Sequence, residues 1–351
     1  MPDRSDPART TTILKALLAI GIVVGVFVGI LPRIADMEEV WRHLHDIGVW
    51  AWLGLVAITV WNQGTYWWVT MAALPGLGFG QAATVNLSST AVANTVPAGG
   101  GVGVGVSAAM LGSWGFSPGA VGRYVLVTGV WNNFVKLGMP IIALALLAFG
   151  GGVERRLVLA SGIGIVVLLV AVVLLYLVLR SEELARRVGS ALGAAVSRVR
   201  ALVGKGPVGS WDDKAARFRT DSIDLVQERW HWLTLATVVG HVSLFVVLFV
   251  TMRLIGIDAE SLTFAESLAG FAFARLVTAI PLTPGAVGMI ELGYVGAFVT
   301  LGANENLVVA AVLAFRTLTY LLPIPLGAVT YLVWRQRSDW RGGDEPAAAS
   351  S

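Results

Sequence analysis

Three charged residues stand in stretches of sequence that are otherwise mostly apolar: Arg275, Glu291 and Arg316. An ionisable side chain at membrane depth costs on the order of 3 kcal/mol or more, so each needs a partner or a function. A guanidinium keeps its proton and binds a phosphate through paired donors. Arg275 and Arg316 are therefore candidates for holding an anionic headgroup, and Glu291 for relaying a proton or a cation. The alternative is a structural ion pair between Glu291 and one of the arginines.

Two segments rich in proline and glycine interrupt apolar sequence. They contain Pro281, Pro284, Gly285 and Gly288 in the second half of the chain, and Pro97, Gly99, Gly100, Gly101 and Gly103 in the first. A broken backbone in lipid is tolerated only where protein or a water-filled cavity covers its free N–H and C=O groups. Free N–H groups at a helix N-terminus bind anions, although close helix packing explains the glycines equally well. Asn94, beside the first break, is a further candidate for the binding site.

The composition is that of an integral membrane protein. The 351 residues are 56% hydrophobic and 13% charged, whereas a soluble domain carries roughly 25% charged residues. The chain has no cysteine, which excludes disulfides and thiolate metal sites. Its 13 tryptophans suit the interfacial belts of a membrane protein. The formal net charge of +3 says little by itself, and we expect no nucleic-acid partner.

Stretches of membrane-spanning length alternate with shorter apolar pieces. A span takes roughly 17–25 helical residues, and the candidates are 12–31, 49–71, 119–149, 157–179, 231–253 and 304–335. The long candidates 119–149 and 304–335 carry prolines and are expected to tilt or kink. The pieces that flank the breaks are 81–96 with 99–113, and 263–280 with 287–301. Pieces of about 15 residues are short for a span, so each pair predicts a re-entrant helical hairpin. Two tilted full spans for each pair, giving eight to ten spans, is the alternative.

The two halves of the chain repeat one another. A shift of 185 positions places Phe264 on Phe79, Gly285 on Gly100, Gly288 on Gly103 and Pro325 on Pro140. We therefore expect a first repeat over 48–150, a connecting span over 157–179 and a second repeat over 231–335. The predicted fold is an all-α polytopic membrane protein with two inverted-topology halves, about six full spans and two re-entrant hairpins.

The main polar segment, 180–230, predicts how the two halves are oriented across the membrane. Its ten basic residues mark the cytoplasmic side, so span 231–253 runs outward. If hairpin 81–113 returns to its own side, span 49–71 runs inward, and both termini are cytoplasmic. The segment is either an amphipathic helix on an anionic inner leaflet or a solvated loop helix. The tail, 336–351, is expected to be disordered.

The motifs around the breaks resemble the lysylphosphatidylglycerol synthase transmembrane-region family, also called flippase-like membrane proteins. The residues that carry the resemblance are Arg275, Pro281-Leu-Thr-Pro-Gly-Ala-Val-Gly-Met-Ile-Glu291, Phe315-Arg-Thr-Leu-Thr-Tyr320 and Thr95-Val-Pro-Ala-Gly-Gly-Gly. Ala286 stands where the family usually has a second glycine. Many members carry an arginine soon after the first block, and here none occurs before Arg123. The resemblance covers roughly residues 12–335, without the aminoacyl-transferase domain of the larger members.

The resemblance implies a flippase-like transporter of the bacterial plasma membrane that moves a phospholipid or lipid-linked molecule between leaflets. Its anionic headgroup would pass through a polar cavity lined by both hairpins. We expect no enzymatic activity, cofactor or metal, because no nucleophile or metal-ligand set is recognisable; an intramembrane lipid-modifying enzyme would need one. A non-catalytic membrane subunit or regulator of a lipid or cell-envelope synthase is the alternative, and homo-oligomerisation is left open.

Overall fold

The computed structural model describes residues 29–96, 99–149, 155–202, 206, 209, 211–276 and 283–336, and these form helices and connections without a strand. Most of the expected span 12–31, nearly all of the tail 336–351, Pro97 and Pro281 lie outside the described residues.

The helices fall into two sets of the same order. The first set consists of α4 (Val49–Ala73), α5 (Phe79–Thr95), α6 (Gly99–Ser113) and α7 (Pro118–Phe149). The second consists of α10 (Trp211–Ile255), α11 (Phe264–Leu276), α12 (Met289–Thr300), α13 (Glu305–Arg316) and α14 (Pro323–Gln336). The helices α5 and α11 begin at Phe79 and Phe264, the residues that the 185-position shift superimposes.

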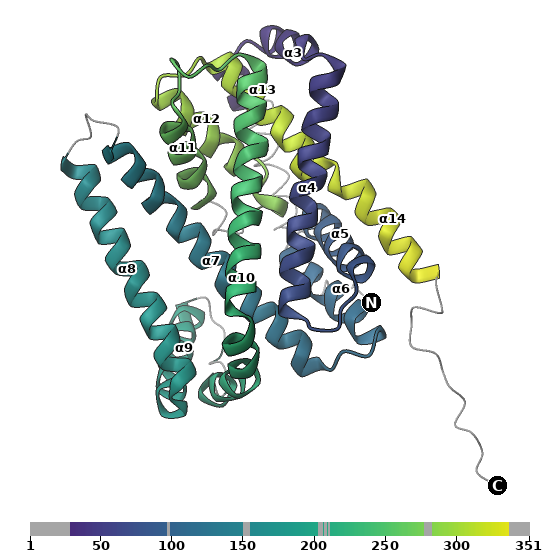
Figure 1. Ribbon diagram of the computed structural model, residues 1–351, viewed down its shortest axis with the longest axis vertical. Helices are drawn as coiled ribbons and strands as arrows, with labels where there is room; N and C mark the ends of the chain where they lie inside the picture. The colour runs from purple at the N-terminus through teal and green to yellow at the C-terminus, as the bar shows by residue number, and fades with distance from the viewer. Residues whose placement is uncertain are drawn as a thin grey trace, which may run out of the picture.

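The two sets run in opposite directions in space. In Figure 1 α4 descends beside the rising α10, while α5 and α6 lie in the lower part and α11 and α12 in the upper part. Each hairpin packs against the last long helix of the other half, α5 against α14 and α11 against α7. Each half therefore depends on the other for its packing.

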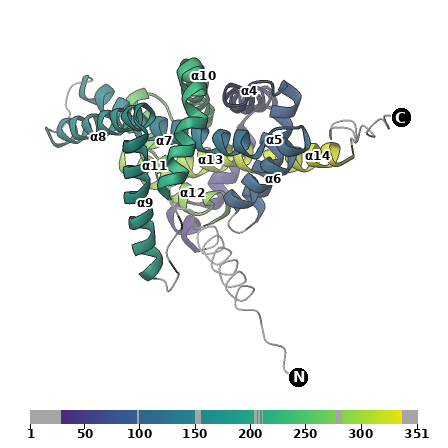
Figure 2. The same cartoon turned by 90° about the horizontal axis from the view of Figure 1, so that it is seen from below.

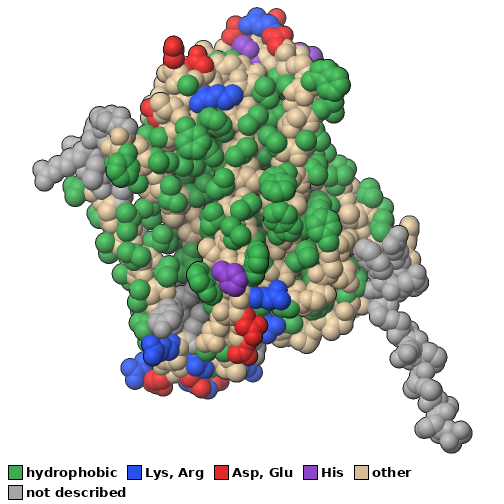
Figure 3. Space-filling model, in the orientation of Figure 1, with side chains coloured by type: hydrophobic (Ala, Val, Ile, Leu, Met, Phe, Trp, Pro, Cys, Tyr) green, Lys and Arg blue, Asp and Glu red, His purple; other side chains and the backbone are tan. Residues whose placement is uncertain are grey.

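Hydrophobic side chains cover much of one face of the molecule. Figure 3 shows charged side chains gathered at its two ends, with apolar side chains dominating the face between them. By length and composition, three described helices qualify as membrane spans, namely Pro118–Phe149, Ile223–Ile255 and Glu305–Gln336. The pair α3 (Met37–Asp46) and α4, bent by 88°, is a fourth if it is counted as one span. The helix α8 (Arg155–Arg180) also exposes apolar residues such as Ile163, which is 66% exposed. The chain is an all-α, multi-pass membrane protein, and the six full spans remain a prediction.

The described part of the basic segment 180–230 is mostly helical. The helix α9 (Glu182–Leu202) packs against α10, which continues without interruption across residue 230 into the span. Arg186 joins the two helices, since it donates to Asp213 at 2.7 Å. Figure 2, which looks along the long axis of the molecule, shows α9 from the side over its full length, so α9 runs perpendicular to that axis. This is the orientation of a helix that lies along a membrane surface.

The first hairpin is packed closely through a glycine. A Cβ at Gly103 of α6 would lie 2.7 Å from the carbonyl oxygen of Ser89 on α5, whereas no atom of a described residue lies within 4 Å of a Cβ at Gly105. Close packing therefore explains Gly103, and the same stretch of α5 meets α14 closely at Gly327, where a Cβ would collide with the carbonyl oxygen of Leu87.

We expect Gly103→Ala to destabilise the protein, although alanine is a better helix former by about 1 kcal/mol. The added methyl group forces α5 and α6 apart, and overpacking typically costs about 1–3 kcal/mol. Gly105→Ala is the matched control on the same helix and should keep or raise the stability. Thermal unfolding in detergent measures both, and a Gly103→Ala protein that melts at or above the wild-type temperature contradicts this packing.

Candidate functional site

A buried ion pair joins the second break to the last long helix. Glu291 on the first turn of α12 is 1% exposed, and its Oε1 accepts from the Nε of Arg316 at 2.6 Å. Its Oε2 accepts from the backbone N–H of Gly288 at 2.7 Å, which caps α12. Both carboxylate oxygens are thus bonded, and the helix N-terminus also favours the negative charge. Of the two partners considered for Glu291, Arg316 makes the ion pair.

Arg316 is held at a distortion of its own helix. It ends α13, and residues 317–321 form a π-helical turn before α14. Such turns are frequent at functional sites. The guanidinium carbon lies 4.4 Å from the centroid of the Tyr320 ring, and Nη2 donates to the carbonyl of Gly285 at 3.1 Å. The arginine therefore spans from the ion pair to the break itself.

Tyr320 connects this arrangement to the first hairpin. Its hydroxyl donates to the backbone carbonyl of Asn94 at 2.6 Å, and the Asn94 amide donates to the backbone carbonyl of Tyr320 at 3.2 Å. The two reciprocal bonds bring the end of α5 to the π-helical turn. The two breaks, far apart in sequence, thus meet around Arg316 and Tyr320.

The backbone of the second break depends on glycine. Gly285 has φ +56°, and a side chain there would collide with the ring of Tyr320. Gly288 has φ +86° and Ala286 has φ +55°. A left-handed conformation costs a residue with a Cβ roughly 1–2 kcal/mol. Ala286 therefore carries backbone strain that a glycine at this position would not have.

A cavity of about 230 Å³ lies at this meeting point. Arg275 from α11, Arg316 from α13 and Asn94 from α5 all line it, together with polar side chains of α4 that include Asn62 and Gln63. Asn62 donates to the carbonyl of Gly240 at 3.0 Å, which fixes α4 against α10, while its buried Oδ1 has no hydrogen-bond partner among the described residues. The cavity thus combines two guanidinium groups with uncharged amides.

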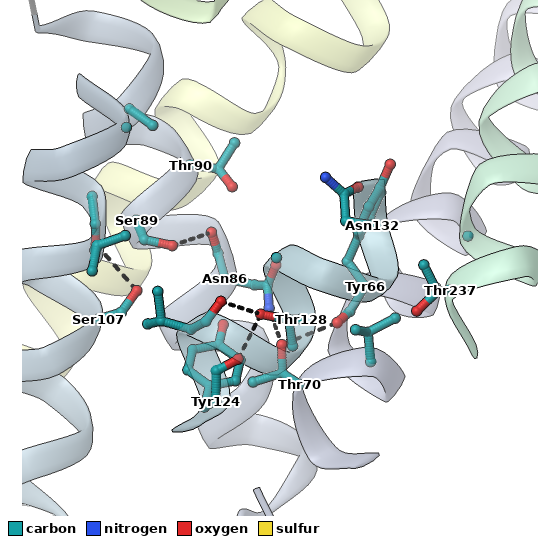
Figure 4. Close-up of a pocket in the computed structure, with 18 of the residues that line it drawn as sticks. Tyr66, Thr70, Asn86, Ser89, Thr90, Ser107, Tyr124, Thr128, Asn132 and Thr237 are labelled. Atoms are coloured by element: carbon teal, nitrogen blue, oxygen red, sulfur yellow. Dashed lines mark hydrogen bonds between the residues drawn. The ribbon is translucent and has the colours of Figure 1, made fainter. Parts of the chain in front are cut away.

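A second cavity, of about 430 Å³, adjoins the first. Tyr66, Asn86 and Thr90 line both. Figure 4 shows its polar side chains, which come from α4, α5, α6, α7 and α10 and surround a common space. Gly100 and Gly103 of the first break also line it.

The structure brings the four candidate binding residues together with Gly285 of the second break. Arg275, Arg316, Asn94 and Gly285 line the smaller cavity, and Glu291 is buried directly behind Arg316. Gly99 packs against the backbone of Ala93 rather than against a cavity, and Gly101 lines neither cavity. No group of three or more potential metal ligands occurs among the described residues.

Sequence reasoning assigned no role to Tyr320 or to the hydroxyl groups of the larger cavity. Tyr320 lies four positions after Arg316, the spacing at which helical side chains meet. Its contact with the guanidinium could therefore have been predicted from the sequence. The threonine and serine residues that line the larger cavity come from separate helices. No spacing along the chain connects them.

We compared the sequence with known protein families and with curated proteins. The sequence model of the family described as "Lysylphosphatidylglycerol synthase TM region" matches residues 16–327. No curated protein matches the chain significantly.

We expect Glu291→Ala and Arg316→Ala each to destabilise the protein by about 3 kcal/mol, since removing one partner leaves the other charge buried. The double variant should lose much less than the sum of the two, because it leaves no lone charge. The measurement is a double-mutant cycle from denaturant unfolding in mixed micelles. The exposed pair of Arg187 with Glu183, 74% and 68% exposed, is the matched control and should show little coupling. Strict additivity at Glu291 and Arg316 would refute the pairing.

Proposed function

Because the chain belongs to the lysylphosphatidylglycerol synthase transmembrane-region family, a multi-pass membrane family tied to lipid or envelope biology, we propose that it moves a phospholipid or lipid-linked molecule between leaflets. The observation that carries this proposal is the cavity in which Arg275 and Arg316 meet. The headgroup crosses through this polar interior while the acyl chains stay in lipid. No covalent chemistry is required of the protein.

Arg275 and Arg316 hold the phosphate of the headgroup. A guanidinium has five N–H donors, and Arg316 uses its Nε and Nη2 groups on Glu291 and Gly285. Its Nη1 group makes no hydrogen bond to any described residue and is available to an anion. A phosphate offers the same charge-assisted, paired geometry as a carboxylate, so it competes with Glu291 for Arg316.

Glu291 restores the site after the headgroup leaves. When a phosphate takes Arg316, the carboxylate keeps its bond from the Gly288 N–H and compensates for the lost partner by binding a proton or a cation. When the phosphate departs, the ion pair forms again and returns Arg316 to its resting position. An ion gradient or the lipid gradient supplies the driving force.

The two halves act as an inverted repeat. Their opposite directions in Figure 1 and the packing of each hairpin against the other half support this interpretation. Inverted repeats with broken helices around a central site are a recurrent design of transporters, in which one half moves against the other. The hydrogen bonds between Asn94 and Tyr320 join the two breaks, so movement of one hairpin displaces residues beside the other.

A non-catalytic subunit of a lipid or cell-envelope synthase is the second candidate. The family description names a synthase, and α9 with the polar part of α10 offers a charged surface at one end of the molecule (Figure 3). In this case the purified protein alone moves no lipid, and adding the synthase gives activity.

The molecule lies in the bacterial plasma membrane with both termini and the basic segment in the cytoplasm, and α9 rests on the anionic inner leaflet. The chain has no cysteine, so single cysteines report the orientation directly. Arg198→Cys on α9 should react with a membrane-impermeant maleimide only in inside-out vesicles. Glu260→Cys, between α10 and α11, should react only in right-side-out vesicles. The reverse pattern contradicts this topology.

The transport proposal is tested by reconstituting the purified protein in vesicles that contain labelled phospholipids. We expect headgroups to cross without chemical change, and we expect Arg275→Ala and Arg316→Ala each to slow the crossing about tenfold or more, because a hydrogen bond to a charged group contributes roughly 1.5–3 kcal/mol. Arg42→Ala, an exposed arginine of α3, is the matched control. A new lipid product would indicate an enzyme instead, and an unchanged rate in both arginine variants would remove these residues from the site.

A further inference from the structure

The larger cavity, of about 430 Å³, has the size of a ligand pocket, which is typically about 300–1,000 Å³. No Asp, Glu, Lys or Arg is among the described residues that line it. Hydroxyl and amide groups take their place, including those of Tyr66, Asn86, Thr90, Tyr124, Thr128 and Asn132 (Figure 4). We propose that this cavity binds an uncharged, hydroxyl-rich headgroup, a sugar or a polyol, attached to the phosphate that Arg275 and Arg316 hold. The inference rests on the proposed function and names its substrate class.

Several of the hydroxyl groups that line the cavity already donate a hydrogen bond to a backbone carbonyl. Thr128 donates to the carbonyl of Tyr124 at 2.7 Å, Ser107 to that of Gly103 at 3.1 Å, and Thr237 to that of Leu233 at 2.6 Å. A hydroxyl group that donates within its own helix has only acceptor lone pairs left. These residues therefore favour a ligand that donates hydrogen bonds, and they disfavour a second anionic group.

His241 adds a hydrogen-bond acceptor that has no partner in the described part of the chain. It lines the cavity and is 2% exposed, and its Nδ1 lies 3.0 Å from the carbonyl oxygen of Thr237. A carbonyl only accepts, so Nδ1 carries the proton in that bond, and Nε2 of the neutral ring is an acceptor. Nε2 is buried and has no hydrogen-bond partner within the described residues. An unsatisfied buried acceptor is costly, and a ligand hydroxyl satisfies it.

The lining also contains groups that can donate. The side chains of Tyr66, Thr90 and Asn132 make no hydrogen bond to other described residues, so their O–H and N–H groups are available to a ligand. A sugar or polyol hydroxyl both donates and accepts, and it therefore matches a wall that holds both kinds of group. An ammonium group only donates and brings a charge that this wall has no carboxylate to balance.

The two cavities are placed to bind one molecule. Tyr66, Asn86 and Thr90 line both, so a headgroup in the larger cavity lies beside a phosphate in the smaller one. The phosphate meets Arg275 and Arg316, and the hydroxyl groups reach the uncharged wall. The division of charge between the cavities thus corresponds to the division of charge in a phospholipid with a sugar or polyol headgroup.

The test compares lipids with identical acyl chains in vesicles that contain the full-length protein. We expect phosphatidylinositol to cross at least tenfold faster than phosphatidic acid, phosphatidylethanolamine or lysyl-phosphatidylglycerol. A site built for hydroxyl groups rejects the first two, which lack them in the headgroup, and the wall has no carboxylate to balance the ammonium groups of the third. If phosphatidic acid or a cationic lipid crosses as fast, the inference is wrong and the transport proposal stands. If the wild-type protein moves none of these lipids, the transport proposal fails and the inference fails with it.

Variants locate the effect in the cavity. We expect Asn132→Leu and Thr128→Val each to slow phosphatidylinositol several-fold and to leave the slower crossing of phosphatidic acid unchanged, which also shows that the variants are folded. Thr59→Val is the matched control, because Thr59 makes the same bond to its own helix, to the carbonyl of Leu55 at 2.7 Å, and does not line the cavity. If Asn132→Leu and Thr128→Val alter phosphatidylinositol no more than Thr59→Val does, the cavity is not the headgroup site and the inference is overturned.

Discussion

The buried ion pair between Glu291 and Arg316 is the interaction on which the rest of the site depends. It fixes the first turn of α12 through Gly288 and holds the end of α13 against the carbonyl of Gly285. An isolated charge at this depth is unfavourable, so each residue keeps the other in place.

The ion pair has this influence because the two halves of the molecule are interlocked. The α5 hairpin packs against α14, and the α11 hairpin packs against α7. Asn94 and Tyr320 bond to each other where these packings meet. The π-helical turn at residues 317–321 allows Arg316 and Tyr320 to face the cavity together. The candidate site is therefore built from both halves of the chain.

Local sequence signals found much of this arrangement. Charge in apolar sequence identified Glu291 and Arg316, and the proline and glycine residues identified the two breaks. The internal repeat aligned Phe79 with Phe264, where α5 and α11 begin. The same signals left open whether Glu291 pairs with Arg275 or Arg316, because both lie at membrane depth and neither spacing excludes the bond. They also gave no sign that α10 continues unbroken from the basic segment into the span, since its polar and apolar parts each have their own pattern.

The sequence by itself determined the membrane class, the helical character, the two breaks and the charged residues worth examining, because hydropathy, helix breaking and charge are properties of short segments. Only the tertiary structure decided which arginine meets Glu291, that Tyr320 joins the two breaks, and that hydroxyl groups from five helices surround one cavity. These outcomes depend on contacts between residues far apart in the chain. Such contacts follow from how whole helices pack, and helix packing is set by the shapes of many side chains together.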